Sequence, residues 1–414
     1  MLTSAKFSSA EFIDQEQEFG AHNYHPLPVV LSKGRGVYLW DVEGKQYYDF
    51  LSAYSAVNQG HCHPRLIKAL MEQAGKLTLT SRAFYNDQLG PFTEYITSFF
   101  GYDKVLPMNT GVEAVETAVK MARKWGYEVK NVPENQAIIV TASGNFHGRT
   151  MTAVTISTDP NTKNNFGPFL PGFKTVQYDN LEEMKVACAN PNVVAVLLEP
   201  IQGEAGVIVP SDEYLKETVA ICRENNILFL ADEVQTGIAR TGKMLACDHL
   251  GIRPDILILG KALSGGVLPV SAVLADDEIM LCIKEGQHGS TFGGNPLACA
   301  VAMEALQVVE DEQLTQNAAR MGEIFRQEIK SFISNHPYVK TVRGRGLLNA
   351  IEIDESEDSE TAWNLCLTMS NKGLLAKPTH GNIIRFAPPL VINESQLREC
   401  IEIICLSIEE SGRS

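Results

Sequence analysis

Two charged side chains stand at the ends of two predicted buried strands. Asp232 closes the apolar run ILFLAD, and Lys261 follows the run DILILG. In open α/β sheets the carboxyl ends of the strands form the ligand crevice, so we expect both groups to face one cleft. An unpaired buried charge costs several kcal/mol. The two side chains are therefore predicted either to form a structural ion pair or to take part in catalysis.

A turn before a predicted helix offers backbone donors for an anion. In the segment NTGVEAVETAVKMARKWG, Thr110 and Glu113 have the spacing of a capping box, and Gly111 allows close approach of the backbone. An apolar stripe of helical period follows, at Val112, Val115, Val119 and Ala122. Amide groups at a helix N-terminus bind phosphate. An ordinary helix cap is the alternative interpretation.

The elements that position these residues alternate between short apolar strands and amphipathic helices. The runs between residues 100 and 310 are AIIVTA at 137–142, VVAVLLEP at 193–200, ILFLADE at 227–233, DILILGKAL at 255–263 and PVSAVLA at 269–275. Continuous apolar strands separated by helices are typical of a mostly parallel sheet covered on both faces. We predict an α/β fold with a helix-sandwiched sheet.

The two ends of the chain have a different pattern, typical of a smaller α+β unit. The last hundred residues predict helices near 311–334 and 359–373, strands in VKTVRGRGLLNAIEI and IIRFAPPLVI, and a terminal helix. Near the start, YLWDVEGKQYYDF predicts a hairpin that packs against this unit. The predicted units are therefore an N-terminal segment at 1–54, a large cofactor-binding domain at 55–310 and a small domain at 311–414.

The sequence around the two charged residues resembles that of the class III aminotransferases of fold type I. The resemblance covers nearly the whole chain, including ADEVQTG, GKALSGG, EPIQGEAGVIVP and FLSAYSAVNQGHCHP. It implies that Lys261 holds pyridoxal phosphate as a Schiff base and then moves the substrate proton. It implies that Asp232 meets the pyridine nitrogen, that Gln235 contacts the ring hydroxyl, and that Phe146 stacks on the ring. A buried core position is the alternative for Phe146.

The resemblance also implies how the cofactor phosphate is bound. The turn at Thr110, Gly111 and Val112 matches the phosphate-binding turn of the family. In HGSTFGGNP, the hydroxyls of Ser290 and Thr291 match a second phosphate contact that the family supplies from the neighbouring subunit. We therefore expect a homodimer with shared active sites. Without the resemblance, HGSTFGGNP is an ordinary loop.

Five further residues match substrate contacts of family members that act on ornithine. Tyr24 and Arg149 match the grip on the α-amino and α-carboxylate groups, and Tyr54 matches a pocket wall. Arg385 matches the α-carboxylate site for 2-oxoglutarate, and Glu204 matches the carboxylate that masks it when ornithine binds. The expected reaction moves the δ-amine of L-ornithine to 2-oxoglutarate, giving glutamate 5-semialdehyde, which cyclises to pyrroline-5-carboxylate, and glutamate. Ordinary packing and structural charges are the alternative for these residues.

One position departs from the animal enzymes that act on ornithine, because His147 stands where they have tryptophan. Transfer from acetylornithine or 4-aminobutyrate therefore stays an alternative. An aminomutase, which needs no external oxoacid, and a non-catalytic binding protein of the same fold are two further alternatives.

Composition narrows the partners and the compartment. A formal net charge of −15 disfavours nucleic acid and anionic membranes, and no apolar stretch is long enough to span a bilayer. The nine scattered cysteines lack metal-site spacing, so we expect reduced thiols and no metal. The stretch MLTSAKFSSAEFIDQEQEFG resembles neither a signal peptide nor a transit peptide. We expect a cytoplasmic protein, or a mitochondrial matrix protein if a presequence is missing from this sequence.

Overall fold

Seven strands form the central sheet of the computed structural model, which describes residues 8–411. Residues 1–7, part of the stretch examined for a targeting signal, and residues 412–414 lie outside the described residues. The strand order is β4-β10-β9-β8-β7-β5-β6. Every pairing is parallel except the two made by β10. The bounds are β4 (Lys104–Met108), β5 (Ile138–Ala142), β6 (Phe173–Val176), β7 (Val193–Leu198), β8 (Leu228–Asp232), β9 (Ile256–Leu259) and β10 (Ser271–Ala275).

All five strands predicted between residues 100 and 310 are present, as β5, β7, β8, β9 and β10. The sequence did not predict β4 and β6, which form the two edges of the sheet. An edge strand is covered on fewer sides, so it needs no continuous apolar run. Strand β4 contains Pro107, which is typical of edges, and β6 includes the exposed Lys174.

Helices cover both faces of this sheet, and alternate residues of β9 show the two layers. Ile256 and Ile258 pack in one core cluster with α5 (Gly111–Glu128), whereas Leu257 and Leu259 pack in another with α11 (Pro296–Asp311). The remaining helices of this part are α3 (Pro64–Ala74), α4 (Leu89–Phe100), α6 (Met151–Ile156), α7 (Pro160–Lys163), α8 (Leu181–Cys188), α9 (Asp212–Glu224) and α10 (Asp277–Met280), with the short 3-10 helices η1 (Cys247–His249) and η2 (Lys261–Ser264).

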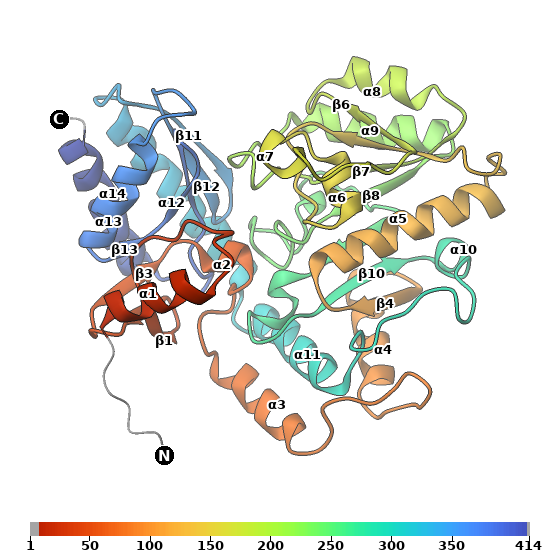
Figure 1. Ribbon diagram of the computed structural model, residues 1–414, viewed down its shortest axis with the longest axis horizontal. Helices are drawn as coiled ribbons and strands as arrows, with labels where there is room; N and C mark the ends of the chain where they lie inside the picture. The colour runs from red at the N-terminus through yellow and green to blue at the C-terminus, as the bar shows by residue number, and fades with distance from the viewer. Residues whose placement is uncertain (1–7, 412–414) are drawn as a thin grey trace.

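The N- and C-terminal segments together form the smaller α+β part, as predicted. One sheet has the order β11-β12-β15-β14, with β11 (Val339–Arg345), β12 (Leu348–Ile353), β14 (Lys377–His380) and β15 (Ile383–Phe386). A second sheet joins the two ends of the chain, because β13 (Leu374–Leu375) pairs with β3 (Gln46–Asp49) beside β2 (Tyr38–Asp41) and β1 (Leu31–Arg35). In Figure 1 the red N-terminal elements lie beside the blue C-terminal ones. The helices are α1 (Ser9–Phe19), α2 (Ser52–Ser55), α12 (Leu314–Ile333), α13 (Thr361–Asn371) and α14 (Glu394–Ser411).

The carboxyl ends of β5, β7, β8 and β9 meet at one edge of the central sheet, where four polar segments follow them. These segments carry Phe146 and His147 after β5, Glu199 and Glu204 after β7, Asp232 and Gln235 around the end of β8, and Lys261 after β9. Among residues 8–411, no helix is long and apolar enough to cross a membrane. The same residues contain no group of three or more His, Cys, Asp or Glu side chains that could hold a metal ion.

Candidate active site

A cavity of about 150 Å³ opens at this edge of the sheet. Six residues predicted from the sequence to bind the cofactor line it: Gly111, Val112, Phe146, Asp232, Gln235 and Lys261. The structure adds four lining residues that the sequence reasoning did not assign to the cofactor site: His147, Gly148, Glu199 and Val234. An amine, carboxylates, an imidazole and the start of a long helix therefore meet in one small space.

Lys261 begins the 3-10 helix η2 in a backbone conformation that side chains rarely adopt. Its φ is +42°, in the left-handed region. Such strained residues cluster at functional sites, where the surrounding structure holds them. Burial lowers the pKa of the Lys261 amine, and the nearby carboxylates of Glu204 and Asp232 oppose this only in part. Compared with an exposed lysine, this amine is therefore shifted toward its neutral form, which is the nucleophilic one.

Asp232 does not pair with Lys261, so the structural ion pair left open by the sequence is not formed. Among the described residues, the ion-pair partner of Asp232 is His147, whose Nδ1 lies 2.7 Å from Oδ2. The Val234 amide donates to Oδ1 at 3.1 Å. Because a carboxylate only accepts, Nδ1 of His147 carries the proton, and Nε2 is buried without a partner in the structure. His147 and the Val234 amide thus hold the Asp232 carboxylate in place, and Asp232 still lines the cavity.

His147 is therefore more than a wall of the pocket. Burial opposes its positive charge, but the hydrogen bond and the charge of Asp232 outweigh this and raise the pKa of His147. The sequence could not show this bond, because it depends on the path of the loop after β5. The available signal was its place beside Phe146, one residue along the same loop.

Glu199 is a second buried carboxyl group of the cavity, with 5% of its surface exposed. Its Oε2 accepts a hydrogen bond of 2.9 Å from the Phe146 amide, which links the end of β7 to the loop after β5. Burial raises the pKa of Glu199 to about 7, with a further rise from Asp232 and an opposing effect of His147. The sequence signal was available, because Glu199 directly follows the apolar run VVAVLL as Asp232 directly follows ILFLA.

The buried Glu199 carboxyl makes stability depend on pH. The pKa of this carboxyl in the folded protein, about 7, exceeds its ordinary value of 4.5. The protonated carboxyl therefore stabilises the folded state fully below pH 4.5, and this contribution is lost as the pH rises through about 7. Glu199→Gln cannot ionise, yet its amide oxygen can still accept the Phe146 bond. We expect the unfolding free energy of the variant, relative to the parent protein, to rise by about 3 kcal/mol between pH 4 and pH 8.

Chemical denaturation across that pH range measures this difference. Glu213→Gln, in the exposed first turn of α9, is the matched control and should show no such trend. A difference between parent and Glu199→Gln that stays constant with pH contradicts a raised pKa at Glu199.

Glu204, Arg385 and Gln235 form a closed set of hydrogen bonds beside the cavity. Nη1 of Arg385 donates to Oε1 of Glu204 at 2.7 Å and to Oε1 of Gln235 at 2.9 Å. Nε2 of Gln235 donates to the same Glu204 oxygen at 3.0 Å. Burial alone raises a carboxyl pKa, but the Arg385 charge and hydrogen bonds outweigh it and lower that of Glu204. The Gln235 amide is thus engaged by Glu204 and Arg385, the pair identified from the sequence.

Two aromatic side chains assigned from the sequence lie against arginines. The Arg385 guanidinium carbon is 4.9 Å from the ring centre of Tyr54, in the range of cation–π contacts. Tyr54 belongs to a run of four residues with positive φ in α2, so this short segment is strained. The Arg149 guanidinium lies 5.3 Å from the centre of the Phe146 ring, while Arg149 itself is exposed.

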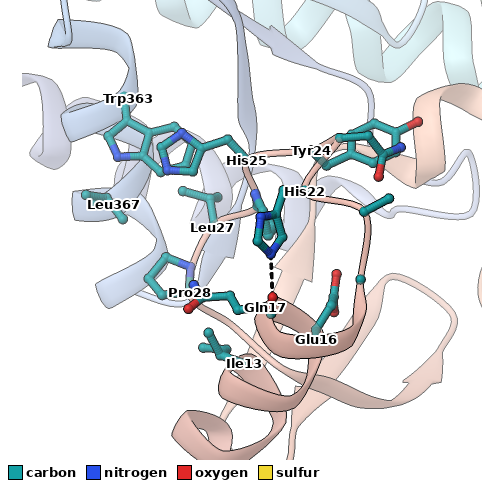
Figure 2. Close-up of a pocket in the computed structure, with 14 residues that line it drawn as sticks. Ile13, Glu16, Gln17, His22, Tyr24, His25, Leu27, Pro28, Trp363 and Leu367 are labelled. Atoms are coloured by element: carbon teal, nitrogen blue, oxygen red, sulfur yellow. Dashed lines mark hydrogen bonds between the residues drawn. The ribbon is translucent and has the colours of Figure 1, made fainter.

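Tyr24 lies outside the cofactor cavity. It is 74% exposed and lines a separate cavity of about 530 Å³ between the segment after α1 and helix α13. Figure 2 shows Tyr24 apart from the stacked rings of His25 and Trp363, whose centres are 4.4 Å apart. The structure therefore groups Tyr54, Glu204 and Arg385 near the cofactor cavity. Tyr24 does not line this cavity, but it lies near Tyr54, since burial raises the pKa of Tyr54 and Tyr24 adds to this rise.

The turn before α5 has the capping box that the sequence predicted. Thr110 Oγ1 accepts from the Glu113 amide at 3.3 Å, and Glu113 Oε2 accepts from the Thr110 amide at 2.8 Å. A Cβ on Gly111 would lie 2.7 Å from Val234 Cγ1, so only glycine fits there. This close packing leaves the N-terminus of an 18-residue helix at the cavity.

The HGSTFGGNP loop lies near the same helix of its own chain. Ser290 Oγ accepts a hydrogen bond of 2.8 Å from Nδ2 of Asn109, the residue before the cap, and Thr291 is exposed. His288 lies 2.8 Å from the Thr117 hydroxyl through Nε2 and 2.9 Å from the Lys120 amine through Nδ1. Neither Ser290 nor Thr291 lines the cofactor cavity within this chain.

The residues of the cavity fit pyridoxal phosphate. The Lys261 amine, with its lowered pKa, suits an aldehyde, the Asp232 carboxylate suits a protonated ring nitrogen, and the start of α5 at Gly111 suits a phosphate. Phe146 is a lining aromatic ring that can cover a flat heterocycle. Among the described residues, the only ion pair between residues that line the cavity is the one between Asp232 and His147. A bound cofactor with its own charges would therefore compensate the other buried charged groups of the cavity.

Comparison with known proteins agrees with this site. The family model for class III aminotransferases matches residues 19–408. The chain is 62% identical to the mitochondrial ornithine aminotransferase of Drosophila ananassae, over 94% of this chain and 89% of the relative. It also resembles the crystal structure of the ornithine aminotransferase from Toxoplasma gondii, with a TM-score of 0.96, 48% identity, and coverage of 98% of this chain and 96% of that one.

Two further structures extend the comparison. The crystal structure of the acetylornithine aminotransferase from Elizabethkingia anophelis is 57% identical in sequence to this chain and has a TM-score of 0.90. The match covers 98% of this chain and 100% of that one. Another structure of the Toxoplasma gondii protein has pyridoxal phosphate in partial occupancy at its active site. With a family match over nearly its whole length and a cavity that fits the family's cofactor, the chain belongs to the class III aminotransferases.

Proposed function

We propose that this enzyme transfers the δ-amino group of L-ornithine to 2-oxoglutarate, with pyridoxal phosphate as its cofactor. The observation that carries the substrate assignment is the ion pair of the buried Arg385 with the half-buried Glu204 beside the cavity of Lys261. The fly and Toxoplasma relatives named ornithine aminotransferases support it. The products are glutamate 5-semialdehyde, which cyclises to pyrroline-5-carboxylate, and glutamate.

When bound, pyridoxal phosphate supplies a carbonyl that condenses with amines and a ring that withdraws electrons from the reacting carbon. Lys261 would hold the cofactor through its Nζ, and the same Nζ, when free, would accept the proton that leaves the substrate carbon. Asp232 keeps the ring nitrogen protonated, and His147 fixes that carboxylate from behind. Thr110, Gly111 and Val112 offer the phosphate site at the start of α5.

Ornithine carries two amines, so the enzyme must direct the δ-amine and not the α-amine to the cofactor. An uncovered Arg385 would bind the α-carboxylate and bring the α-amine to the reacting position. Glu204 prevents this, because its carboxylate already occupies Arg385 at 2.7 Å. For the oxoacid, Glu204 moves away and Arg385 takes the α-carboxylate. Tyr24 and Arg149 then bind the far end of either substrate, and Tyr54 forms the wall beneath Arg385.

Removing the charge of Glu204 is expected to change which amine reacts. In Glu204→Gln the Arg385 guanidinium is no longer neutralised, so α-carboxylates bind it more readily. We expect the share of α-amine product to rise about tenfold or more and the KM for 2-oxoglutarate to fall, since hydrogen bonds to charged groups contribute about 1.5–3 kcal/mol. Chromatography separates the δ-product, pyrroline-5-carboxylate, from its 2-carboxylate isomer. An unchanged product ratio contradicts masking by Glu204.

The proposed reaction is tested with purified protein, pyridoxal phosphate, ornithine and 2-oxoglutarate, by trapping the cyclic imine. We expect imine formation that depends on the oxoacid. That dependence also separates transamination from an aminomutase. Turnover of N-acetylornithine without any imine from ornithine would overturn the proposal.

Transfer from N-acetylornithine is the second candidate. The 57% identity to the acetylornithine aminotransferase of Elizabethkingia anophelis favours this candidate. The exposed position of Tyr24 also favours it, because Tyr24 would have to turn toward the cavity to bind the free α-amino group of ornithine. A parallel assay of both substrates decides between the two, because the acetyl group blocks exactly the α-amine that Tyr24 is proposed to bind.

The assembly proposed is a homodimer in which Ser290 and Thr291 reach the phosphate site of the partner. Sedimentation of the holoenzyme tests the dimer, and a Thr291→Ala variant tests the shared site through weaker cofactor retention. We keep the cytoplasm as the proposed compartment and the mitochondrial matrix as the alternative that the name of the fly relative favours. Imaging of the tagged chain in its own cell distinguishes them.

A further inference from the structure

The four-stranded sheet β11-β12-β15-β14 contains Arg385 and also contacts the turn that bears Glu204. Arg385 lies on β15 of this sheet, whereas Glu204 lies in a turn after β7 of the central sheet. Two side chains of the small sheet donate to the backbone of that turn. Thr379 Oγ1 on β14 donates to the Glu204 carbonyl at 2.9 Å, and Arg343 Nε on β11 donates to the Gly206 carbonyl at 2.9 Å.

The turn that bears Glu204 is a compact unit. The amides of Gly206 and Val207 both donate to the Gly203 carbonyl at 3.2 Å, and a β-bridge between Gln202 and Ile208 closes its base. Its position relative to Arg385 therefore depends on contacts from outside the turn. A Cβ on Gly206 would lie 2.8 Å from Ile383 Cδ1, so the turn also packs tightly against β15.

Thr379 occupies an irregular position of its strand. In the pairing of β14 with β15, Lys377 lies opposite Arg385 and Pro378 opposite Ile384, and the register then shifts before His380. Thr379 is the residue within this shift. Such irregularities turn a side chain away from its regular direction and are common beside active sites. Here the Thr379 hydroxyl reaches the backbone of Glu204.

The same short strand approaches Tyr24. The Lys377 ammonium lies 5.9 Å from the centre of the Tyr24 ring. Strand β14 thus contacts the Glu204 turn through Thr379, pairs opposite Arg385, and contacts Tyr24 through Lys377. Three residues of the proposed substrate site, far apart in the sequence, share this support.

We propose that Thr379 and Arg343 are positioning residues that set how often Glu204 covers Arg385, and thereby the choice between amine and carboxylate at this site. The inference rests on the proposed function, in which covering of Arg385 selects the δ-amine. With both anchors, the turn holds the Glu204 carboxylate at Arg385. Without them the turn samples more positions, and Arg385 is uncovered for a larger fraction of the time.

Glutarate, a dicarboxylate without a reactive carbonyl, measures this fraction without turnover. Its dissociation constant from the holoenzyme, by calorimetry, falls as Arg385 becomes less covered. Thr379→Val keeps the shape but loses the hydroxyl, and we expect glutarate to bind about three- to tenfold more tightly, the effect of one hydrogen bond. Thr379→Ser keeps the hydroxyl and is expected to bind as the parent does. Arg343→Met tests the second anchor and should act in the same direction.

Glu204→Gln gives the reference change in the glutarate dissociation constant, because this variant removes the negative charge that covers Arg385. If Glu204→Gln tightens glutarate but Thr379→Val binds it like the parent, the positioning role is overturned and the proposed function stands. Equal tightening in Thr379→Ser and Thr379→Val also overturns it, since the hydroxyl then has no part. If Glu204→Gln does not tighten glutarate, the masking in the proposed function fails, and the inference fails with it.

Product analysis gives a second readout that a general loss of stability does not produce. Thr379→Val is expected to raise the share of α-amine product from ornithine in the same direction as Glu204→Gln, and Thr379→Ser to restore the parent ratio. A lower rate with an unchanged product ratio contradicts the positioning role.

Discussion

Lys261→Ala is expected to abolish transamination, with a loss of about 10⁴-fold or more, the upper range for a positioned general base. The variant loses both the covalent attachment of the cofactor and the only amine of the cavity lining among the described residues. The lowered pKa of Lys261 gives the reason, because burial shifts this amine toward its neutral form, which can attack or accept a proton. An ionised surface lysine could do neither efficiently at neutral pH.

Borohydride reduction followed by mass spectrometry separates attachment from catalysis. The parent protein is expected to gain the mass of one reduced cofactor per chain, and Lys261→Ala to gain none at the site. Lys216→Ala, on an exposed position of α9, is the matched control and should behave as the parent. Full attachment in Lys261→Ala would mean that another amine holds the cofactor.

Asp232→Asn is expected to lower kcat by about 10²- to 10³-fold, the range for removing one preorganised electrostatic group. Asparagine has the same shape but no charge, so the ring nitrogen of the cofactor loses the group that keeps it protonated. The amide oxygen of asparagine can still accept the bond from His147, but the negative charge that strengthens this 2.7 Å bond is lost. Burial is then opposed less strongly, because the charge of Asp232 is gone, and the pKa of His147 should fall below that in the parent.

Two measurements check this prediction: steady-state kinetics and the titration of His147 by nuclear magnetic resonance. His147→Asn is the matched variant, because it keeps the Asp232 carboxylate and removes only its support. It is expected to cost less activity than Asp232→Asn. If the two variants lose activity equally, Asp232 acts mainly through its bond with His147 and not on the cofactor.

The sequence predicted those parts of the site that follow from regular structure. Asp232 and Lys261 were found because buried strands end in polar residues at one edge of a parallel sheet, and the Thr110 cap because its pattern is local. The five inner strands were predicted for the same reason. The edge strands β4 and β6 were missed, since an edge does not require an unbroken apolar run.

The contacts between segments could not be predicted from spacing. The bond between His147 and Asp232, the bond between Glu199 and the Phe146 amide, and the bonds through Gln235 each join segments that are far apart in the sequence. Glu199 could have been predicted in the same way as Asp232 and Lys261, because it also follows a buried apolar strand. The exposed position of Tyr24 depends on how the N-terminal segment packs against α13, which local sequence does not determine.

The central claim is that the amine at the δ position, and not the α position, is transferred. Ornithine with isotopically labelled nitrogen at the δ position, incubated with the holoenzyme and 2-oxoglutarate, tests it directly by mass spectrometry of the glutamate formed. The account predicts that nearly all of the new glutamate carries the label. Unlabelled glutamate, with the label retained in the product of ornithine, would contradict it.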